Sequence, residues 1–180
     1  CNYGIGKDGK IALCVEEKNR SWCTSSNAND QRAVTIECAS DKEEPYAMHQ
    51  VVYDRLVDLC EDICRRNGKK KLLWFGDKNK SLNYQPKADE MLITVHRWFA
   101  NKSCPGDWLY ARLGDLAAKV TSRLGSGNVE VISSGMQAGE FQGLTEEQVL
   151  AKVGPLFTAD QKKSGILASV SMAQFILESG

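Results

Sequence analysis

The fold of this chain is decided by residues 33–38, AVTIEC, and by the segment at residues 45–68, PYAMHQVVYDRLVDLCEDICRRNG. The first stretch has three consecutive β-branched residues, Val34 to Ile36, which favour a buried and central strand. In the second stretch apolar residues recur at intervals of three and four, which predicts one amphipathic helix. Pro45 near its first turn and Gly68 after its last turn are the expected boundaries of that helix.

Shorter elements are predicted before the strand at residues 33–38 and after the long helix. Residues 2–6 and 11–15 form a hairpin pattern around Asp8-Gly9, a favoured two-residue turn because both positions tolerate positive φ. A polar loop at residues 16–31 carries Trp22. Beyond the long helix we expect a short strand at 72–75, a turn-rich stretch at 76–90, a strand at 92–96 and a last helix at 107–124.

Bulk composition excludes several classes of function. The 180 residues include 23 basic and 23 acidic side chains, so charge suggests neither a nucleic acid nor an anionic membrane as a partner. No apolar run approaches the roughly 20 residues that span a bilayer. The seven cysteines form no recognisable disulfide framework. Cys60 and Cys64, four residues apart on the predicted helix, are expected to be small buried apolar side chains.

The character of the chain changes after Gly125. Residues 126–143 are rich in glycine, which is typical of a linker, and residues 144–180 are again helical in pattern. Thr145 and Gln148 have the spacing of a capping box at the start of a helix. We therefore expect three parts: a domain at residues 1–125, a linker at 126–143 and a helical segment at 144–180.

The residues with chemical potential lie in HRWFANKSCPG, residues 96–106. The His96 imidazole and the Cys104 thiolate are both good zinc ligands, and the loop between them could bring them to one ion. Lys102 lies two residues before the thiol, where an ammonium could stabilise an oxyanion. Upstream, Glu37 ends the strand-like run 33–37, and an inward-facing carboxylate costs free energy unless it is paired or used.

Together these residues resemble the zinc-dependent N-acetylmuramoyl-L-alanine amidases, the family of phage lysozyme-type amidases and peptidoglycan recognition proteins. Five pieces follow the family order over residues 1–125: an Asn-Tyr-x-Ile-Gly-x-Asp-Gly hairpin, a Trp loop, an Ile-Glu strand, a long helix and a His-x7-Cys-Pro-Gly segment. The resemblance implies an α/β fold with a mixed central β-sheet flanked by helices. Peptidoglycan is the implied substrate, cut between N-acetylmuramic acid and L-alanine of the stem peptide.

The resemblance also implies roles for individual residues. His96 and Cys104 would be zinc ligands, Glu37 would move the proton of the attacking water, and Lys102 would share the charge of the tetrahedral intermediate. The first His ligand of the family has no counterpart here, because the only other histidine, His49, lies on the predicted long helix. We therefore expect the chain as given to lack the strand that carries this ligand and to be impaired.

Other residues extend this hypothesis. Trp22 and Tyr3 are the candidates for substrate contact, whereas Trp98 and Trp108 are expected in the core. Residues from about 144 resemble the start of an endo-β-N-acetylglucosaminidase domain, in which Glu178 would be the general acid; a helical linker is the alternative. Both resemblances point to a cell-wall polymer, and hence to an autolysin or endolysin with an extracellular or cell-wall location.

Two other classes of protein are also compatible with the sequence. A non-catalytic peptidoglycan-binding module would explain the missing ligand, but it would need neither Cys104, Lys102 nor Glu37. A cysteine-based redox or metal-storage protein would explain the number of thiols, but the sequence contains no Cys-x-x-Cys motif.

Overall fold

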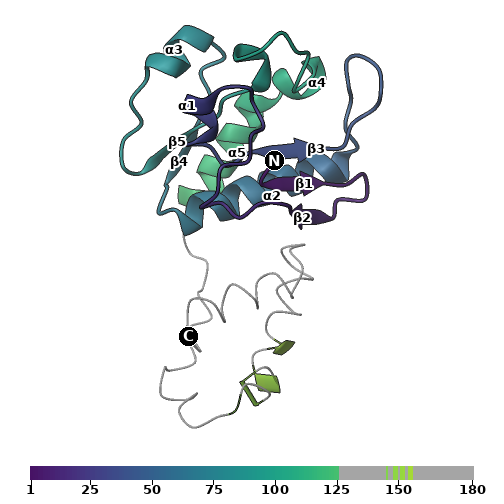
Figure 1. Ribbon diagram of the computed structural model, residues 1–180, viewed down its shortest axis with the longest axis vertical. Helices are drawn as coiled ribbons and strands as arrows, with labels where there is room; N and C mark the ends of the chain where they lie inside the picture. Colours follow the sequence, from purple (N-terminus) through teal and green to yellow (C-terminus); the bar gives the residue numbers. More distant parts are fainter. Residues whose placement is uncertain (126–144, 146–147, 150, 153, 156–180) are drawn as a thin grey trace. The chain divides into compact units, whose positions relative to one another are not determined.

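The computed structural model describes residues 1–125, 145, 148–149, 151–152 and 154–155, and the predictions for other positions, including Glu178, lie outside them. The chain divides into two units, Cys1–Ser126 and Gly127–Gly180, and the first is drawn in colour in Figure 1. In the second unit the predicted capping box is present. The Thr145 N–H donates to Gln148 Oε1 (2.9 Å), and the Gln148 N–H donates to Thr145 Oγ1 (3.4 Å).

The first sheet has three strands in the order β2-β1-β3. Strands β1 (Tyr3–Ile5) and β2 (Ile11–Leu13) are antiparallel, and β1 is parallel to β3 (Ile36–Cys38). The predicted hairpin is therefore confirmed. The prediction that β3 is central is wrong for the described residues, because β1 takes the central place and β3 the edge. The β-branched run reflects burial of β3 against the core, and burial alone does not decide strand order.

The hairpin turn differs in type from the prediction. The Gly6 N–H donates to the Lys10 carbonyl (2.9 Å), so three residues form the loop. Only Gly9 has a positive φ, +79°, and the Asp8 side chain accepts a hydrogen bond from the Lys10 N–H (3.1 Å). A three-residue loop needs one left-handed residue at its end, whereas the predicted two-residue turn needs two.

Helix α2 (Gln50–Arg66) follows β3 and begins five residues later than predicted. Pro45 belongs to the preceding loop, where it follows a cis peptide bond and its carbonyl accepts a hydrogen bond from the Trp108 N–H (3.0 Å). His49 takes the N-cap position without a capping side-chain bond. The predicted end is confirmed, since Asn67 is the C-cap and Gly68 has a φ of +64°.

A second, two-stranded parallel sheet pairs β4 (Lys71–Leu73) with β5 (Glu90–Leu92). The stretch between them contains helix α3 (Lys78–Asn83), which was not predicted and which Asp77 caps by accepting from the Lys80 N–H (2.6 Å). A strand was predicted at residues 92–96, but β5 ends at Leu92. His96 instead begins the 3₁₀-helix η1 (His96–Trp98).

The last predicted helix is divided into α4 (Asp107–Tyr110) and α5 (Leu113–Gly125). A further short helix, α1 (Asn27–Asp30), lies in the loop between β2 and β3. Helix α5 packs against both α2 and β4, and α2 also contacts β1.

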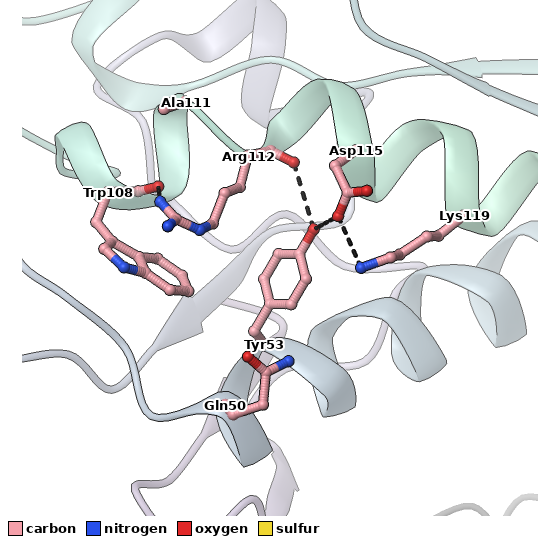
Figure 2. A pocket seen from close by; sticks show the side chains of 7 residues that line it. All are labelled: Gln50, Tyr53, Trp108, Ala111, Arg112, Asp115 and Lys119. Carbon is pink, nitrogen blue, oxygen red and sulfur yellow. Dashed lines mark hydrogen bonds and ion pairs between the residues drawn. The ribbon is translucent and has the colours of Figure 1, made fainter.

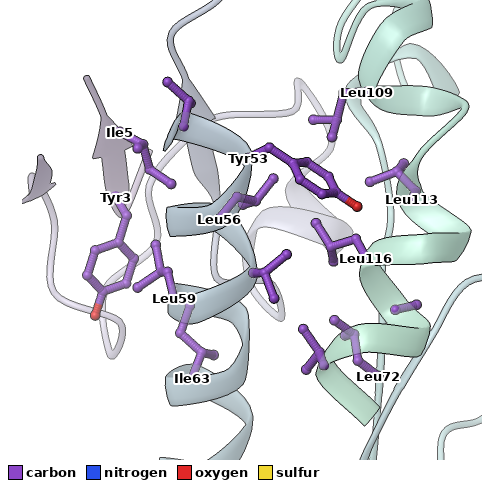
Figure 3. Packing of buried hydrophobic residues seen from close by; sticks show 14 of the residues in the cluster. Tyr3, Ile5, Tyr53, Leu56, Leu59, Ile63, Leu72, Leu109, Leu113 and Leu116 are labelled. Carbon is purple, nitrogen blue, oxygen red and sulfur yellow. The ribbon is translucent and has the colours of Figure 1, made fainter. Parts of the chain in front are cut away.

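Figure 3 shows how the core is divided by α2. Tyr3 and Ile5 of β1 contact one side of the helix, while Leu113 and Leu116 of α5 face its other side. The predicted α/β class, a mixed sheet flanked by helices, is confirmed, although the sheet is in two parts. Among the described residues no helix combines the length and apolarity needed to cross a membrane.

Candidate active site

Glu37 lies in the middle of β3, paired with Gly4 of β1. Its side chain is exposed, whereas those of Ile36 and Cys38 pack against the core on the other face of the strand. Burial, followed by the charge of Glu37, raises the pKa of the Cys38 thiol to about 12. Strand alternation therefore presents the Glu37 carboxylate on the face of the sheet away from α2.

The loop that follows β2 is fixed beside Glu37 by hydrogen bonds to buried partners. Ser21 Oγ and Thr35 Oγ1 share a hydrogen bond, and Asp30 accepts from both the N–H and the hydroxyl of Thr24. The loop places Cys23 Sγ 3.6 Å from Glu37 Oε1, in a hydrogen bond with the thiol as donor. Burial, with the Glu37 charge as the second cause, raises the pKa of the Cys23 thiol.

The segment from His96 to Cys104 forms a closed loop. The Arg97 N–H donates to the Cys104 carbonyl (3.0 Å), and the Arg97 guanidinium donates to Asp107 Oδ1 (2.9 Å) and to the Ser103 carbonyl. At the start of this loop, His96 Nε2 is buried and has no hydrogen-bond partner. Buried polar atoms are nearly always satisfied, so this nitrogen is available to a ligand.

Three of the predicted site residues line one extended cavity of about 1340 Å³, which also reaches α2, α5 and the segment between α3 and β5. Glu37, His96 and Cys104 all line it, together with Cys23 and Cys38. Cys104 is exposed by surface area, but partial desolvation of its thiol, together with the charges of Glu37 and Cys23, raises the pKa of the thiol to about 11. A thiol with this pKa is protonated at neutral pH unless a bound cation stabilises the thiolate.

Lys102 is not among the residues that line this cavity. It lies on the exposed part of the loop, and its main-chain N–H donates to the Ala100 carbonyl (2.9 Å). The predicted partner of the oxyanion is therefore on the same loop as Cys104 but does not line the cavity that Glu37, His96 and Cys104 line.

His96 and Cys104 are ligands of the type that zinc prefers, but two ligands are fewer than a zinc site needs. An imidazole nitrogen without a partner and a nearby thiol are ligands that zinc prefers. Within the described residues, however, no three His, Cys, Asp or Glu side chains are grouped closely enough to hold a metal ion. His49 does not supply the missing ligand, because it is exposed at the N-terminus of α2 and does not line the cavity.

The two predicted substrate contacts occupy different environments. The Tyr3 side chain is only 8% exposed and shares the α2 side of the sheet with Ile36. Its hydroxyl donates to Glu17 Oε1 (2.7 Å), and burial together with this bond raises the tyrosine pKa well above its usual range. Trp22 is 76% exposed and has a φ of +54°. The structure thus places Tyr3 on the opposite face of the sheet from Glu37.

The other tryptophans pack inside the domain. Trp98 is buried and stacks on Trp74 with the ring centres 5.0 Å apart. Trp108 packs against the core and meets the Tyr53 ring edge-on. Figure 2 shows the pocket of about 510 Å³ that Trp108, Tyr53 and Arg112 line, and none of the predicted site residues contributes to it.

Sequence reasoning missed two features of the cavity. Cys23 has no metal-ligand motif around it in the sequence, yet its thiol donates a hydrogen bond to Glu37. Arg20 was not predicted as a site residue, although its guanidinium lies 3.6 Å from the centre of the Trp22 ring. The Arg-x-Trp spacing was the available signal, because alternate residues of an extended loop can stack on one side.

Comparison with known proteins agrees with this geometry. The profile of the family described as N-acetylmuramoyl-L-alanine amidase matches residues 1–107, which include Glu37, His96 and Cys104. No curated protein and no solved structure matches the chain. Since the match covers more than half of the sequence and includes the residues gathered at the cavity, this chain belongs to the N-acetylmuramoyl-L-alanine amidase family.

Proposed function

We propose that the protein is a zinc-dependent peptidoglycan hydrolase that cuts the amide bond between N-acetylmuramic acid and L-alanine of the stem peptide. The observation that carries this proposal is the shared cavity of Glu37, His96 and Cys104, in which His96 Nε2 has no partner. The family match supplies the class of bond and of substrate.

His96 and Cys104 are the proposed zinc ligands. A bound zinc ion would supply Lewis-acid chemistry, activating water and polarising the amide carbonyl. Because two protein ligands are one short of the usual three, a further ligand has to complete the site. The loop closure by Arg97 supports the pairing, since it fixes the main chain at both ends of the segment.

Glu37 is the proposed general base and acid. Its exposed carboxylate would take the proton of the attacking water and return it to the leaving L-alanine nitrogen. The Cys23 thiol, 3.6 Å from the carboxylate, orients this group from the loop side. Lys102, exposed on the same loop as Cys104, would balance the negative charge that develops on the carbonyl oxygen.

A second wall-cutting activity is proposed for the C-terminal part. In this hypothesis residues 144–180 begin an N-acetylglucosaminidase-like domain joined by a linker at 126–143, with Glu178 as its general acid. Two domains acting on one polymer would work outside the cytoplasm, at the cell wall. Mass spectrometry of muropeptides from digested cell wall tests this, because glucosaminidase action leaves reducing N-acetylglucosamine ends.

The amidase proposal is tested on purified peptidoglycan with added zinc. Amidase action releases free stem peptides whose new amino termini are L-alanine, at a low rate because the metal site is incomplete. Dansylation followed by mass spectrometry identifies these termini and separates amidase from peptidase products. Digestion that produced other amino termini, and no L-alanine, would contradict the proposal.

A non-catalytic peptidoglycan-binding module is the second candidate. Two observations favour it: the described residues gather fewer than three metal ligands, and the Trp22 ring is exposed. Such a module would co-sediment with cell wall without releasing L-alanine termini, so the same digestion distinguishes the two candidates.

A further inference from the structure

The guanidinium of Arg20 has a stacking partner and no acid partner. It lies over the Trp22 ring, 3.6 Å from the ring centre. Its Nε is buried without a hydrogen bond, and within the described part of the chain no carboxylate or carbonyl accepts from this side chain. A buried N–H of a charged group that finds no acceptor is costly, which points to an acceptor supplied by a ligand.

The other arginines make this absence informative. Of the eight arginines in residues 1–125, six donate a side-chain hydrogen bond to a carboxylate or carbonyl: Arg55, Arg65, Arg66, Arg97, Arg112 and Arg123. The remaining two, Arg20 and Arg32, both line the cavity that contains Glu37, His96 and Cys104. The two arginines without acceptors therefore both line the extended cavity that Glu37, His96 and Cys104 also line, Arg20 half-buried and Arg32 exposed.

The loop that carries Arg20 is held in an unfavourable conformation. Trp22 has a φ of +54° and Ser25 a φ of +62°, in the left-handed region that bulky residues avoid. The bonds of Ser21 to Thr35 and of Thr24 to Asp30 keep the loop in place. Such strain clusters at binding sites, and here it leaves the Trp22 ring 76% exposed beneath the guanidinium.

The chemistry of the site selects the kind of ligand. A planar guanidinium that stacks on an aromatic ring presents its N–H groups in one plane, which suits a carboxylate. In peptidoglycan the N-acetylated sugars are neutral, and the lactyl carboxyl of muramic acid is consumed in the amide bond. The carboxylates close to the scissile bond therefore belong to the stem peptide.

We propose that Arg20, stacked on Trp22, binds a carboxylate of the stem peptide and so sets the preference of the enzyme for the peptide side of its substrate. Arg32 adds a second positive charge to the same cavity. This inference rests on the proposed function, because the identity of the polymer comes from there, and it assigns a specificity role to a residue outside the zinc and proton-transfer groups.

Two probes that differ only in charge test the inference. The first is N-acetylmuramoyl-L-alanyl-D-glutamic acid, and the second is the same compound with both carboxyls converted to carboxamides. Calorimetric titration gives the affinity of the full chain, with zinc, for each probe, and product analysis of the same mixtures reports cleavage. The variants are Arg20→Gln, Arg20→Lys and the control Lys78→Gln, an exposed lysine that does not line the cavity.

The wild-type protein is expected to bind the diacid roughly 10- to 100-fold more tightly than the diamide, the range of one charge-assisted hydrogen-bond pair. Arg20→Gln should remove this preference and leave diamide affinity within about twofold of wild type. Arg20→Lys should keep part of the preference, since it retains charge without the planar fork. Lys78→Gln should behave as wild type.

Equal wild-type affinities for the two probes, or no detectable diacid binding, would overturn the inference. An Arg20→Gln variant that lost affinity for both probes equally would also overturn it, because that pattern indicates a structural role. Cleavage without carboxylate preference would leave the amidase proposal standing while the Arg20 role fails. Carboxylate-selective binding without cleavage would support the role of Arg20 and contradict the amidase proposal.

Discussion

The Arg97 N–H donates a hydrogen bond of 3.0 Å to the Cys104 carbonyl, and this bond closes the loop that joins the two proposed zinc ligands. His96 directly precedes the donor, and Cys104 carries the acceptor. Arg97 strengthens the closure through Asp107 and the Ser103 carbonyl. Neither ligand lies in a strand or an α-helix, since His96 begins the single turn η1 and Cys104 lies in the loop after it, so the site depends on the integrity of this loop.

The zinc affinity of the chain should depend on both His96 and Cys104. The chain is expected to bind zinc weakly, with a dissociation constant above about 1 µM, because structural zinc sites use four ligands and catalytic sites three. Cys104→Ser and His96→Ala should each weaken binding further, whereas His49→Ala should not, since His49 is outside the cavity. Competition with a chromogenic chelator measures the dissociation constants of the wild type and the three variants. Tight one-to-one binding by the chain, unaffected by Cys104→Ser, would contradict this assignment.

Removal of the exposed ring should affect wall binding and not folding. Trp22→Ala is expected to lower binding to purified cell wall at least about threefold, because aromatic faces supply contact area to ligands. The thermal midpoint should stay within about 2 °C, because exposed substitutions seldom change stability much. Leu13→Ala, at another partly exposed apolar residue, is the matched control. Unchanged sedimentation of Trp22→Ala with cell wall would remove Trp22 from the binding surface.

Acid should weaken the contact between the hairpin and α2. Burial opposes ionisation of Glu17, but hydrogen bonds from Arg66 and Tyr3 outweigh it and hold the pKa of Glu17 below its ordinary value of 4.5. A depressed folded-state pKa stabilises the protein above the unfolded pKa, and this stability is lost as pH falls below 4.5 through the folded value. Glu17→Gln should therefore cost about 1 kcal/mol at pH 7, a value limited by the partial exposure of Arg66.

Urea unfolding of wild type and Glu17→Gln at pH 7 and pH 3 measures this difference. The difference in unfolding free energy between the two proteins should narrow at pH 3, because this pH is below the ordinary glutamate pKa of 4.5 and proton uptake then favours the unfolded wild-type chain. A gap that stays constant, or widens, would show that the carboxylate charge contributes nothing to the contact.

Two glycines with positive φ should differ in their tolerance of alanine. Gly106 has a φ of +82°, and a Cβ there would lie 2.8 Å from Tyr46 Cβ and 3.1 Å from the Pro45 carbonyl. Gly68 has a φ of +64° with nothing within 4 Å. Gly68→Ala should cost about 1 kcal/mol for the left-handed conformation alone, and Gly106→Ala about 2 kcal/mol more for the added clash. If Gly68→Ala and Gly106→Ala lowered the free energy of unfolding in denaturant equally, the close contact at Gly106 would be contradicted.

Much of the fold could be predicted from local patterns. The hairpin, the α2 helix and its end at Gly68 follow from turn chemistry and from the spacing of apolar residues. The start of α2 could not be found this way, because Pro45 has the composition of a helix start but is held by the Trp108 N–H from a distant segment. The position of β3 at a sheet edge likewise depends on pairing partners that a single strand does not encode.

The candidate site was predictable in its residue types and less so in its arrangement. Glu37, His96 and Cys104 line the same extended cavity, while their roles stay predictions. Tyr3 was a candidate for substrate contact, but its register with Ile36 places its ring on the α2 side of the sheet. The role inferred for Arg20 could not be predicted, because the absence of an acid partner is visible only in three dimensions.

The central claim, that Glu37 performs the proton transfers of an amidase, is tested most directly by release of L-alanine amino termini from purified peptidoglycan. Glu37→Gln is compared with wild type at equal bound zinc, and Glu43→Gln serves as an exposed control outside the cavity. We expect Glu37→Gln to lose at least about 100-fold in rate, the usual contribution of a general base, while Glu43→Gln keeps the wild-type rate. Equal release of L-alanine termini by Glu37→Gln and wild type would contradict the account.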